Sequence, residues 1–497
     1  MTDPRAKLLD GPLVGLAAIV VHGRSIAFGF TDLDDRDFIV DDQPFLSNPA
    51  GLLGAFARPY MHVVDARHAY YRPMVTLSYA LDAHWSGIQA LGYHLTNVVL
   101  HAVASLLFFA LLRDLALGPI VTRVAALAFA VHPVLASAVA WIPGRNDSLL
   151  AVFALSSWLF FLRGETRSSW HYRGLHLAAF WFALWTKETA AVIPLVCVVH
   201  LALVEPDAWL RLRRSVWFFA LICGWAVAVA CRQIIRPYAG GLTIGDVAPS
   251  LSVLAAGFGQ LAMPFDPSLI HVKGHLLLWP GVVAGALCAA AMQLVPGVRR
   301  RVVVLGAVVF VAFLCPALAV PGELVLDSRL YLPACGVIIA VAEIVRATAR
   351  DRTALVAFSA VTVVALAAVT TAYEETFRDR RTFARSAVAG APYSGLAHFC
   401  LGQTYQLDGD PDRALAEYRL ALALGGSYAV HNNMAVIHMA SARWTDAELE
   451  LRKELALDPD YVRAYRNLGI VLRHLGRNEE ALSADRRASD LASGTTP

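Results

Sequence analysis

Runs of about 20 mostly apolar residues recur along residues 11–372 and stop after Tyr373. Such a run, folded as a helix, matches the thickness of the hydrocarbon core of a bilayer. The 57% of hydrophobic residues and the mean hydropathy of +0.53 agree with this, because a water-soluble fold could not bury so much apolar surface. The sequence therefore predicts an all-α polytopic transmembrane helix bundle over residues 1–372.

Eleven segments are candidate spans, and the first is expected to stay uncleaved because no small-residue cleavage site follows it. The candidates are 11–30, 93–112, 120–141, 148–162, 174–185, 190–204, 216–231, 276–295, 302–320, 330–345 and 354–372. The stretch 248–275 holds three prolines and is expected to be re-entrant or to lie on the surface. This gives about 11 spans.

Arginine and lysine in short loops mark the cytoplasmic side of a membrane protein. Here they cluster in alternate loops, which predicts a cytoplasmic N-terminus and an external C-terminal domain. The external side then receives the long loop 31–92, the turn 141–147, the Lys187-Glu188 pair and the loop 321–329. Polar residues are thus sorted to one face.

Residues after Tyr373 carry a repeat of close to 34 residues. Small residues recur at this period in two independent sets, namely Gly402, Ala435 and Gly469, and Ala414, Ala447 and Ala481. The period predicts three tetratricopeptide-like repeats at 394–427, 428–460 and 461–494, behind a connecting helix at 373–393. Arrays of this kind form an α-solenoid with a concave surface that binds polypeptides.

Net charge and cysteine usage narrow the function. A net charge of +3 implies no nucleic-acid partner. The seven cysteines show neither a disulfide framework nor the spacing of a metal site.

An acidic segment opens the first external loop. Its six carboxylates are Asp32, Asp34, Asp35, Asp37, Asp41 and Asp42. Crowding of like charges raises some of their pKa values, which suits a general base. A solvated acidic loop is the alternative, and a calcium loop is a poorer one because the glycine and distal glutamate of the EF-hand pattern are missing.

Several polar residues accompany the expected helices. His94, Asn97 and His101 share one helix face by their spacing, and polar groups inside a membrane helix commonly face a site. The others are His132, Arg145, Asp147, Lys187, Glu188, Arg329 and Tyr331. Simpler roles stay open: Asp147 as a helix cap, Lys187-Glu188 as an ion pair, and Arg329 and Tyr331 at a helix start.

Ordered motifs link these residues to a known family. They are Leu33-Asp34-Asp35, Tyr71-Arg72-Pro73-Met74, Gly92-Tyr93-His94-Leu95-Thr96-Asn97 with His101, Phe129-Ala130-Val131-His132-Pro133, Gly144-Arg145-Asn146-Asp147, Lys187-Glu188 and Arg329-Leu330-Tyr331-Leu332-Pro333. With the repeats behind them, they resemble the transmembrane and tetratricopeptide-repeat O-mannosyltransferase-like proteins of the GT-C class. The chain departs at Ala136-Ser137, where relatives often carry an acidic residue.

The resemblance implies a membrane glycosyltransferase. Such enzymes move a sugar, here expected to be mannose, from a polyprenyl-phosphate donor to a hydroxyl acceptor, here expected to be protein Ser or Thr, on the external face. By position, Asp34 and Asp35 match the acidic pair that serves the acceptor. The repeats are expected to present a polypeptide, and the host membrane to be a bacterial inner membrane.

From these residues we expect a single displacement that inverts the anomeric centre, with Asp34 or Asp35 as base. Arg72, Lys187, Arg329 and Arg145 are expected to bind the donor phosphate. The expected lining residues are His94, Asn97, His101, His132, Asp147, Glu188 and Tyr331. No obligatory cofactor or metal is expected, although the acidic loop could bind a divalent ion.

Two other classes compete with the enzyme. A membrane-anchored repeat scaffold would need one span rather than about eleven. A transporter of lipid-linked sugars should carry inverted repeats and polar groups near the midplane, whereas the polar groups here lie near one surface.

Overall fold

The computed structural model describes residues 4–58, 60, 70–204, 244–264, 267–268, 270–272, 275–318, 324–426 and 429–493. Within them the chain is built of helices, with one two-stranded antiparallel sheet. The predicted span 216–231 lies outside the described residues.

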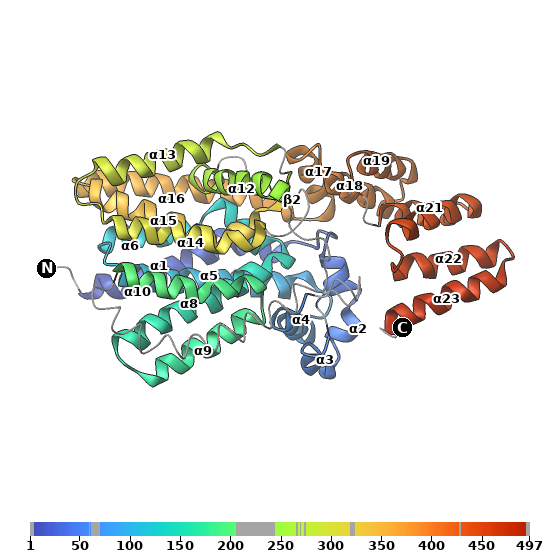
Figure 1. The fold of residues 1–497 in the computed structure, drawn as a ribbon, viewed down its shortest axis with the longest axis horizontal. Helices are drawn as coiled ribbons and strands as arrows, with labels where there is room; N and C mark the ends of the chain where they lie inside the picture. Colours follow the sequence, from blue (N-terminus) through green and yellow to red (C-terminus); the bar gives the residue numbers. More distant parts are fainter. Residues whose placement is uncertain are drawn as a thin grey trace.

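An elongated helix bundle forms the N-terminal part, with the N-terminus at one end and the repeats at the other (Figure 1). Its long helices are α1 (Pro4–His22), α5 (Ala90–Asp114), α6 (Pro119–Ala130), α8 (Arg145–Thr166), α9 (Trp170–Leu184), α10 (Ile193–Val204), α12 (Ile244–Ala262), α13 (Trp279–Leu294), α14 (Arg300–Leu318), α15 (Tyr331–Thr348) and α16 (Arg352–Glu374). α5 packs against α1, α6 and α8, and α14 packs against α15 and α10. Their shared core is apolar, as a membrane bundle requires.

Among the described residues, four helical segments are long and apolar enough to cross a membrane: Ala90–Asp114, Ile142–Thr166, Asp327–Thr348 and Arg352–Phe377. A bent pair, Pro119–Ala130 and Pro133–Ala140, makes a fifth if it is one span. The predicted number of about 11 is therefore not confirmed. Other described helices are shorter than a full span: α9 has 15 residues and the described part of α10 has 12, which reach about 18–23 Å at 1.5 Å per residue. In the proline-bearing stretch 248–275, α12 ends at Ala262 and a strand follows.

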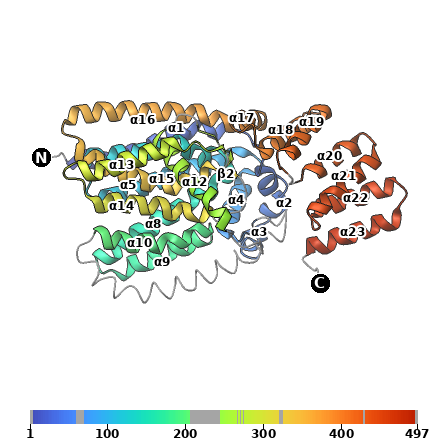
Figure 2. The ribbon, with the colours of Figure 1, turned by 45° about the horizontal axis from the view of Figure 1, so that its top comes forward.

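α16 lies along one edge of the bundle (Figure 2). Only 11% of its most apolar 18-residue stretch is buried inside the protein, and Phe358, Val361 and Val364 are strongly exposed. Exposed apolar side chains on one face suit contact with lipid tails, and the membrane helix bundle predicted from the sequence is confirmed.

Short elements gather at the end of the bundle nearest the repeats (Figure 1). They are η1 (Gly23–Ala27), η2 (Arg36–Val40), α2 (Gln43–Leu46), α3 (Pro49–Gly54), α4 (Pro73–Ser86), η3 (Pro133–Ala136), α7 (Ser137–Ala140), η4 (Ile142–Gly144), η5 (Glu188–Val192) and η7 (Asp327–Leu330). β1 (Ile270–Val272) pairs antiparallel with β2 (Leu324–Leu326), with His271 opposite Val325. Pro73, Pro133 and Pro143 each stand at the first or second position of one of these helices, where a missing N–H costs nothing.

A solenoid of helix pairs follows η8 (Glu375–Phe377) and α17 (Arg380–Gly390). The pairs are α18 (Gly395–Leu407) with α19 (Pro411–Ala423), α20 (Val430–Ala440) with α21 (Trp444–Leu457), and α22 (Val462–His474) with α23 (Asn478–Ser493). A Cβ at Gly402 would lie 2.7 Å from the Tyr418 ring, and one at Gly469 would lie 2.3 Å from Asp485 Oδ1. The small residues that recur every 34 residues thus allow the helices of each pair to pack closely, as their period predicted. The tetratricopeptide-type solenoid is confirmed.

α14 and α15 cross with their backbones in contact. A Cβ at Gly336 would lie 2.4 Å from the Gly306 carbonyl oxygen and 2.5 Å from the Phe310 nitrogen. Glycine pairs of this kind let membrane helices approach closely. The crossing fixes α15, whose first turn follows Arg329 directly.

Enlarging this crossing should destabilise the bundle. We expect Gly336→Ala to lower the free energy of unfolding by about 1–3 kcal/mol, because backbone atoms cannot give way as a flexible side chain can. Thermal unfolding in detergent would measure the loss. Gly285→Ala on α13 is the matched control, since a Cβ there meets nothing within 4 Å. Equal unfolding temperatures for the two variants would contradict the close crossing.

Candidate active site

The acidic segment is shaped by a tight turn at its start. Asp32 has a φ of +59°, in the left-handed region that aspartate tolerates better than most residues. Behind it, the backbone N–H and the hydroxyl of Thr31 donate hydrogen bonds to Asp35 Oδ2, at 2.6 and 2.5 Å. Asp35 is fully buried and immediately precedes η2. Its carboxylate therefore holds the turn.

Asp34 differs from its neighbour. Its carboxylate is partly exposed and makes no hydrogen bond or ion pair with the described residues. Burial, followed by the charges of Asp37 and Asp35, raises the pKa of Asp34 to about 7. Burial raises the pKa of Asp35 to about 6, against the hydrogen bonds from Thr31. The pair thus contains one restrained carboxyl group and one that is free to exchange a proton near neutral pH.

Three of the four expected phosphate-binding cations form one cluster with two carboxylates. Arg72, just before α4, binds Glu188 through two nitrogens, with Nη2 2.7 Å from Oε1 and Nε 3.3 Å from Oε2. Lys187 Nζ lies 2.6 Å from Oδ1 of Asp147, in the first turn of α8. The four side chains are 11–27% exposed, so the pairs are partly desolvated but reachable.

Arg329 completes the cluster without a partner of its own. It lies in η7 and is close enough to Asp147, Arg72 and Glu188 for their charges to act on it. Within the described residues it has neither a hydrogen bond nor an ion pair. Among the described residues the cluster therefore holds three cations and two carboxylates, and the guanidinium that has no partner among them is suited to binding an anion.

Tyr60 lies between the acidic segment and the cations. Its ring centre is 4.5 Å from that of Phe38 in η2, and the Arg72 guanidinium lies 5.6 Å from its ring centre. Burial raises the pKa of Tyr60 to about 12, and both Arg72 and Asp34 act on it electrostatically. The partly exposed carboxylate and the cationic cluster thus face the same tyrosine, a residue that sequence reasoning did not single out.

Arg145 does not belong to the open cluster. Its side chain has no exposed surface and pairs with Asp82 at 2.6 Å. It also donates to Oδ1 of Asn97 and to the Tyr93 carbonyl oxygen, each at 2.7 Å. No edge of this guanidinium is left for a phosphate, so its expected role as a phosphate ligand is replaced by a structural one. Asn97, expected to line the site, serves the same buried network.

The expected lining histidines and Tyr331 are also committed to the bundle. His101 Nδ1 lies 2.6 Å from the hydroxyl of Tyr331, and its Nε2 donates to the Ala130 carbonyl oxygen. His94 Nε2 lies 3.3 Å from the Gly29 oxygen, and His132 Nε2 lies 3.0 Å from the Leu261 oxygen. These buried side chains join helices rather than face an open site.

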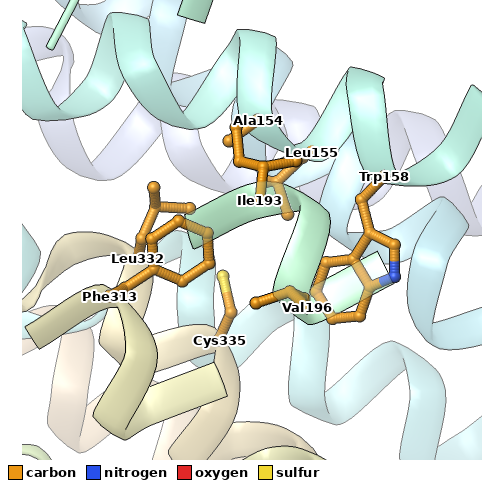
Figure 3. A pocket seen from close by; sticks show the side chains of 8 residues that line it. All are labelled: Ala154, Leu155, Trp158, Ile193, Val196, Phe313, Leu332 and Cys335. Carbon is orange, nitrogen blue, oxygen red and sulfur yellow. The ribbon is translucent and has the colours of Figure 1, made fainter. Parts of the chain in front are cut away.

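A narrow apolar crevice lies inside the bundle (Figure 3). It is lined by Ala154, Leu155, Trp158, Ile193, Val196, Phe313, Leu332 and Cys335. These residues come from α8, α10, α14 and α15, so three of the four walls continue from Asp147, Lys187 and Arg329. An anion at the cluster would therefore have apolar side chains on its membrane side.

Among the described residues, no group of three or more His, Cys, Asp or Glu side chains is arranged to hold a metal ion. The charge at the candidate site comes from the side chains described above.

The raised pKa of Asp34 has a consequence for stability. Because the pKa in the folded chain is about 7 and the ordinary value is 3.8, ionisation of this group opposes folding as the pH rises from about 4 to 7. We expect Asp34→Asn to raise the unfolding temperature at pH 8 and to change it little at pH 4, where the Asp34 carboxyl of the folded wild type is protonated and that of the unfolded chain is only partly ionised. The gain is at most about 4 kcal/mol, reduced by the partial exposure of the group. Unfolding of both proteins at the two pH values measures it, and an equal difference at both would contradict the raised pKa.

Comparison with known proteins gives the following relatives. Protein O-mannosyl-transferase Tmtc1 of Drosophila melanogaster is 33% identical over 198 residues, which are 39% of this chain and 23% of that protein. Protein O-mannosyl-transferase tmtc2 of Xenopus laevis is 32% identical over 33% of this chain and 21% of its own length. Protein O-mannosyl-transferase TMTC4 of Homo sapiens is 31% identical over 35% of this chain and 25% of its own length. The matched residues thus span about a quarter of the length of these curated relatives.

No family model matches the chain. The crystal structure of the APC/C hetero-tetramer Cut9-Hcn1 covers 86% of this chain and 90% of its own, with 13% identity and a TM-score of 0.24, too low to bear on the helix arrangement. The sequence relatives carry the comparison. Over about a third of its length, this chain resembles the protein O-mannosyl-transferases of the TMTC group, as its motifs predicted.

Proposed function

We propose that the chain is a membrane glycosyltransferase that moves a sugar from a polyprenyl-phosphate donor to a hydroxyl group of a protein. One observation carries the proposal: the partly exposed Asp34 carboxylate and the Arg329 guanidinium, neither with an ion pair to another described residue, both lie near the Tyr60–Arg72 contact at one end of the helix bundle. The similarity to proteins named protein O-mannosyl-transferases supports mannose as the sugar and serine or threonine as the acceptor.

Asp34 is the base in this proposal. Its carboxylate takes the proton of the acceptor hydroxyl while the oxygen attacks the anomeric carbon. A base with a pKa near the working pH is effective because it is deprotonated often enough and still holds the proton firmly. Asp35 is the weaker candidate, since its Oδ2 already accepts two hydrogen bonds from Thr31 and its side chain is buried. Its proposed role is to hold Asp34 in place.

The leaving group is the lipid phosphate. As the new bond to the acceptor oxygen forms, the bond between the anomeric carbon and the phosphate oxygen breaks, and its electron pair stays on the phosphate. Arg329 meets this charge directly, while Arg72 and Lys187 add to the field although each has a carboxylate partner. A single displacement of this kind inverts the anomeric centre, and the proposed reaction needs no obligatory metal.

The lipid part of the donor explains why the cations lie where apolar walls begin. A polyprenyl chain must stay in an apolar environment while its phosphate remains at the membrane surface. The crevice of Figure 3 is lined by residues of α8, which contains Asp147, and of α10 and α15, which follow Lys187 and Arg329 in the chain. We propose that the first isoprene units of the donor lie along these walls, on the external side of a bacterial inner membrane.

Loss of the base should abolish transfer. We expect Asp34→Asn to lower the rate about 10²–10⁴-fold, because the acceptor proton then has no nearby base. The assay is transfer from defined polyprenyl-phosphate sugars to cell extract, with mass spectrometry of the labelled product. Asp412→Asn, which removes an exposed carboxylate of α19, is the control. Full activity of Asp34→Asn would remove the carboxylate from the mechanism.

Loss of the unpaired cation should act on the chemical step. We expect Arg329→Gln to lower kcat about 10²-fold with a smaller change in KM, since charge on the phosphate is larger in the transition state than in the bound donor. Arg300→Gln is the matched control, because Arg300 also begins a helix but bonds to Gln293 and the Met292 oxygen. A change confined to KM would show that Arg329 only binds the donor.

A further inference from the structure

The acidic segment lies against the solenoid as well as against the membrane bundle. The Gly29 N–H donates to the Arg378 carbonyl oxygen at 2.9 Å. Asp32 pairs with Arg380, at 3.6 Å, and Leu33 packs against the apolar cluster that continues into the repeats. The contact thus begins where the segment leaves the bundle and runs along the start of the solenoid.

A second contact comes from the third repeat. Nη2 of Arg463, in the first turn of α22, lies 2.7 Å from Asp37 Oδ1 and 3.1 Å from Asp41 Oδ2. This one guanidinium joins two carboxylates on either end of η2 to a helix more than 400 residues away in the sequence. The segment is therefore held by α17 at its start and by the third repeat of the solenoid at its end.

These contacts offset the repulsion among the carboxylates of the acidic segment. The segment carries six carboxylates between residues 32 and 42, and Arg36 is the one basic residue among them. Like charges this close repel one another and favour an opened loop unless cations from elsewhere lie among them. Arg380 and Arg463 supply such cations, and Arg463 lies beside Asp37, whose charge acts on Asp34.

We propose that Arg463 is a positioning residue for Asp34. Arg463 ties the acidic segment to the third repeat, so that the solenoid forms one wall of the site. The inference rests on the proposed function only for the role of Asp34 as the base. Since the first helix of the first repeat also lies near Asp34, through Cys400, a polypeptide held by the repeats would be delivered beside this carboxylate.

The first test needs no activity. Hydrogen exchange of the full-length protein in detergent would compare the wild type with Arg463→Ala, Arg463→Lys and Arg473→Ala. We expect the amides of residues 31–42 to exchange roughly five-fold faster in Arg463→Ala, with Arg463→Lys between it and the wild type. Arg473→Ala removes an ion pair to Asp485 from the same helix and should leave this segment unchanged. Unchanged exchange in Arg463→Ala would overturn the proposal.

The second test separates positioning from general damage by the pH profile of transfer. The ionisable groups that act on Asp34, or on which Asp34 acts, are Asp35, Asp37, Tyr60 and Cys400. Without Arg463, the charge of Asp37 is less balanced and raises the pKa of Asp34 further. The activity of Arg463→Ala should therefore fall at pH 7 and recover at higher pH.

A double variant completes this test. Arg463→Ala with Asp37→Asn should bring the pH profile back toward that of the wild type, because the unbalanced charge is gone. Faster exchange with an unmoved profile would overturn the positioning role. If the wild type transfers no sugar while the exchange contrast remains, the tether is supported and the proposed function is overturned instead.

Discussion

A guanidinium with no exposed surface holds the loop end of the bundle together. Arg145 begins α8, pairs with Asp82 of α4 and bonds to Asn97 of α5. Its guanidinium lies 4.8 Å from the ring centre of Tyr79. Removing one partner of such a buried pair leaves an uncompensated charge and commonly costs about 3–5 kcal/mol. Three helices that could slide past one another in an apolar bundle are thereby fixed in register.

The candidate site depends on this register. Tyr79 belongs to the apolar cluster that also contains Phe38 of the acidic segment and Tyr60. Asp147, which pairs with Lys187, lies two residues after Arg145 on the same helix. One buried ion pair therefore supports both the side that carries the acid and the side that carries the cations. Asp34 and Arg329 are exceptions, since neither has an ion pair with another described residue, and perturbed charges of this kind commonly mark functional sites.

How much of this could be predicted follows from the range of the interactions. The 34-residue period and the apolar runs are local, and they correctly predicted the solenoid and the membrane bundle. The sorting of Arg72, Lys187, Asp147, Glu188 and Arg329 to one end follows from loop order, and the structure brings all five together. The number of spans is not confirmed, because four helical segments among the described residues, or five with the bent pair, are long and apolar enough, and the predicted span 216–231 lies outside those residues.

Long-range pairing was out of reach. His22 interrupts the apolar run of the first expected span, yet it is fully buried, with its Nδ1 2.5 Å from Oε1 of Glu374 on α16. Arg145 was read as a phosphate ligand because nothing in the sequence joins it to Asp82. The sequence did not mark Arg463 as part of the site, because its partners Asp37 and Asp41 lie more than 400 residues earlier in the chain. A polar residue in an apolar helix indicates that it has a polar partner, but a single sequence does not identify that partner.

The attachment of the solenoid has a physical reason in the chemistry of Asp34. A carboxyl group with a pKa near 7 needs partial burial and nearby negative charge, and both conditions oppose a closed conformation of the loop that carries it. The restraints within the loop, from Thr31 to Asp35 and from Arg36 to Asp41, do not hold Asp34 itself, and a cation close to Asp34 would lower the pKa that makes it useful. Restraint through Arg463 avoids this conflict: it acts on Asp37 and Asp41 and leaves the Asp34 carboxylate without a cationic partner among the described residues. A second domain that binds the neighbours of the base can hold the base still without neutralising it.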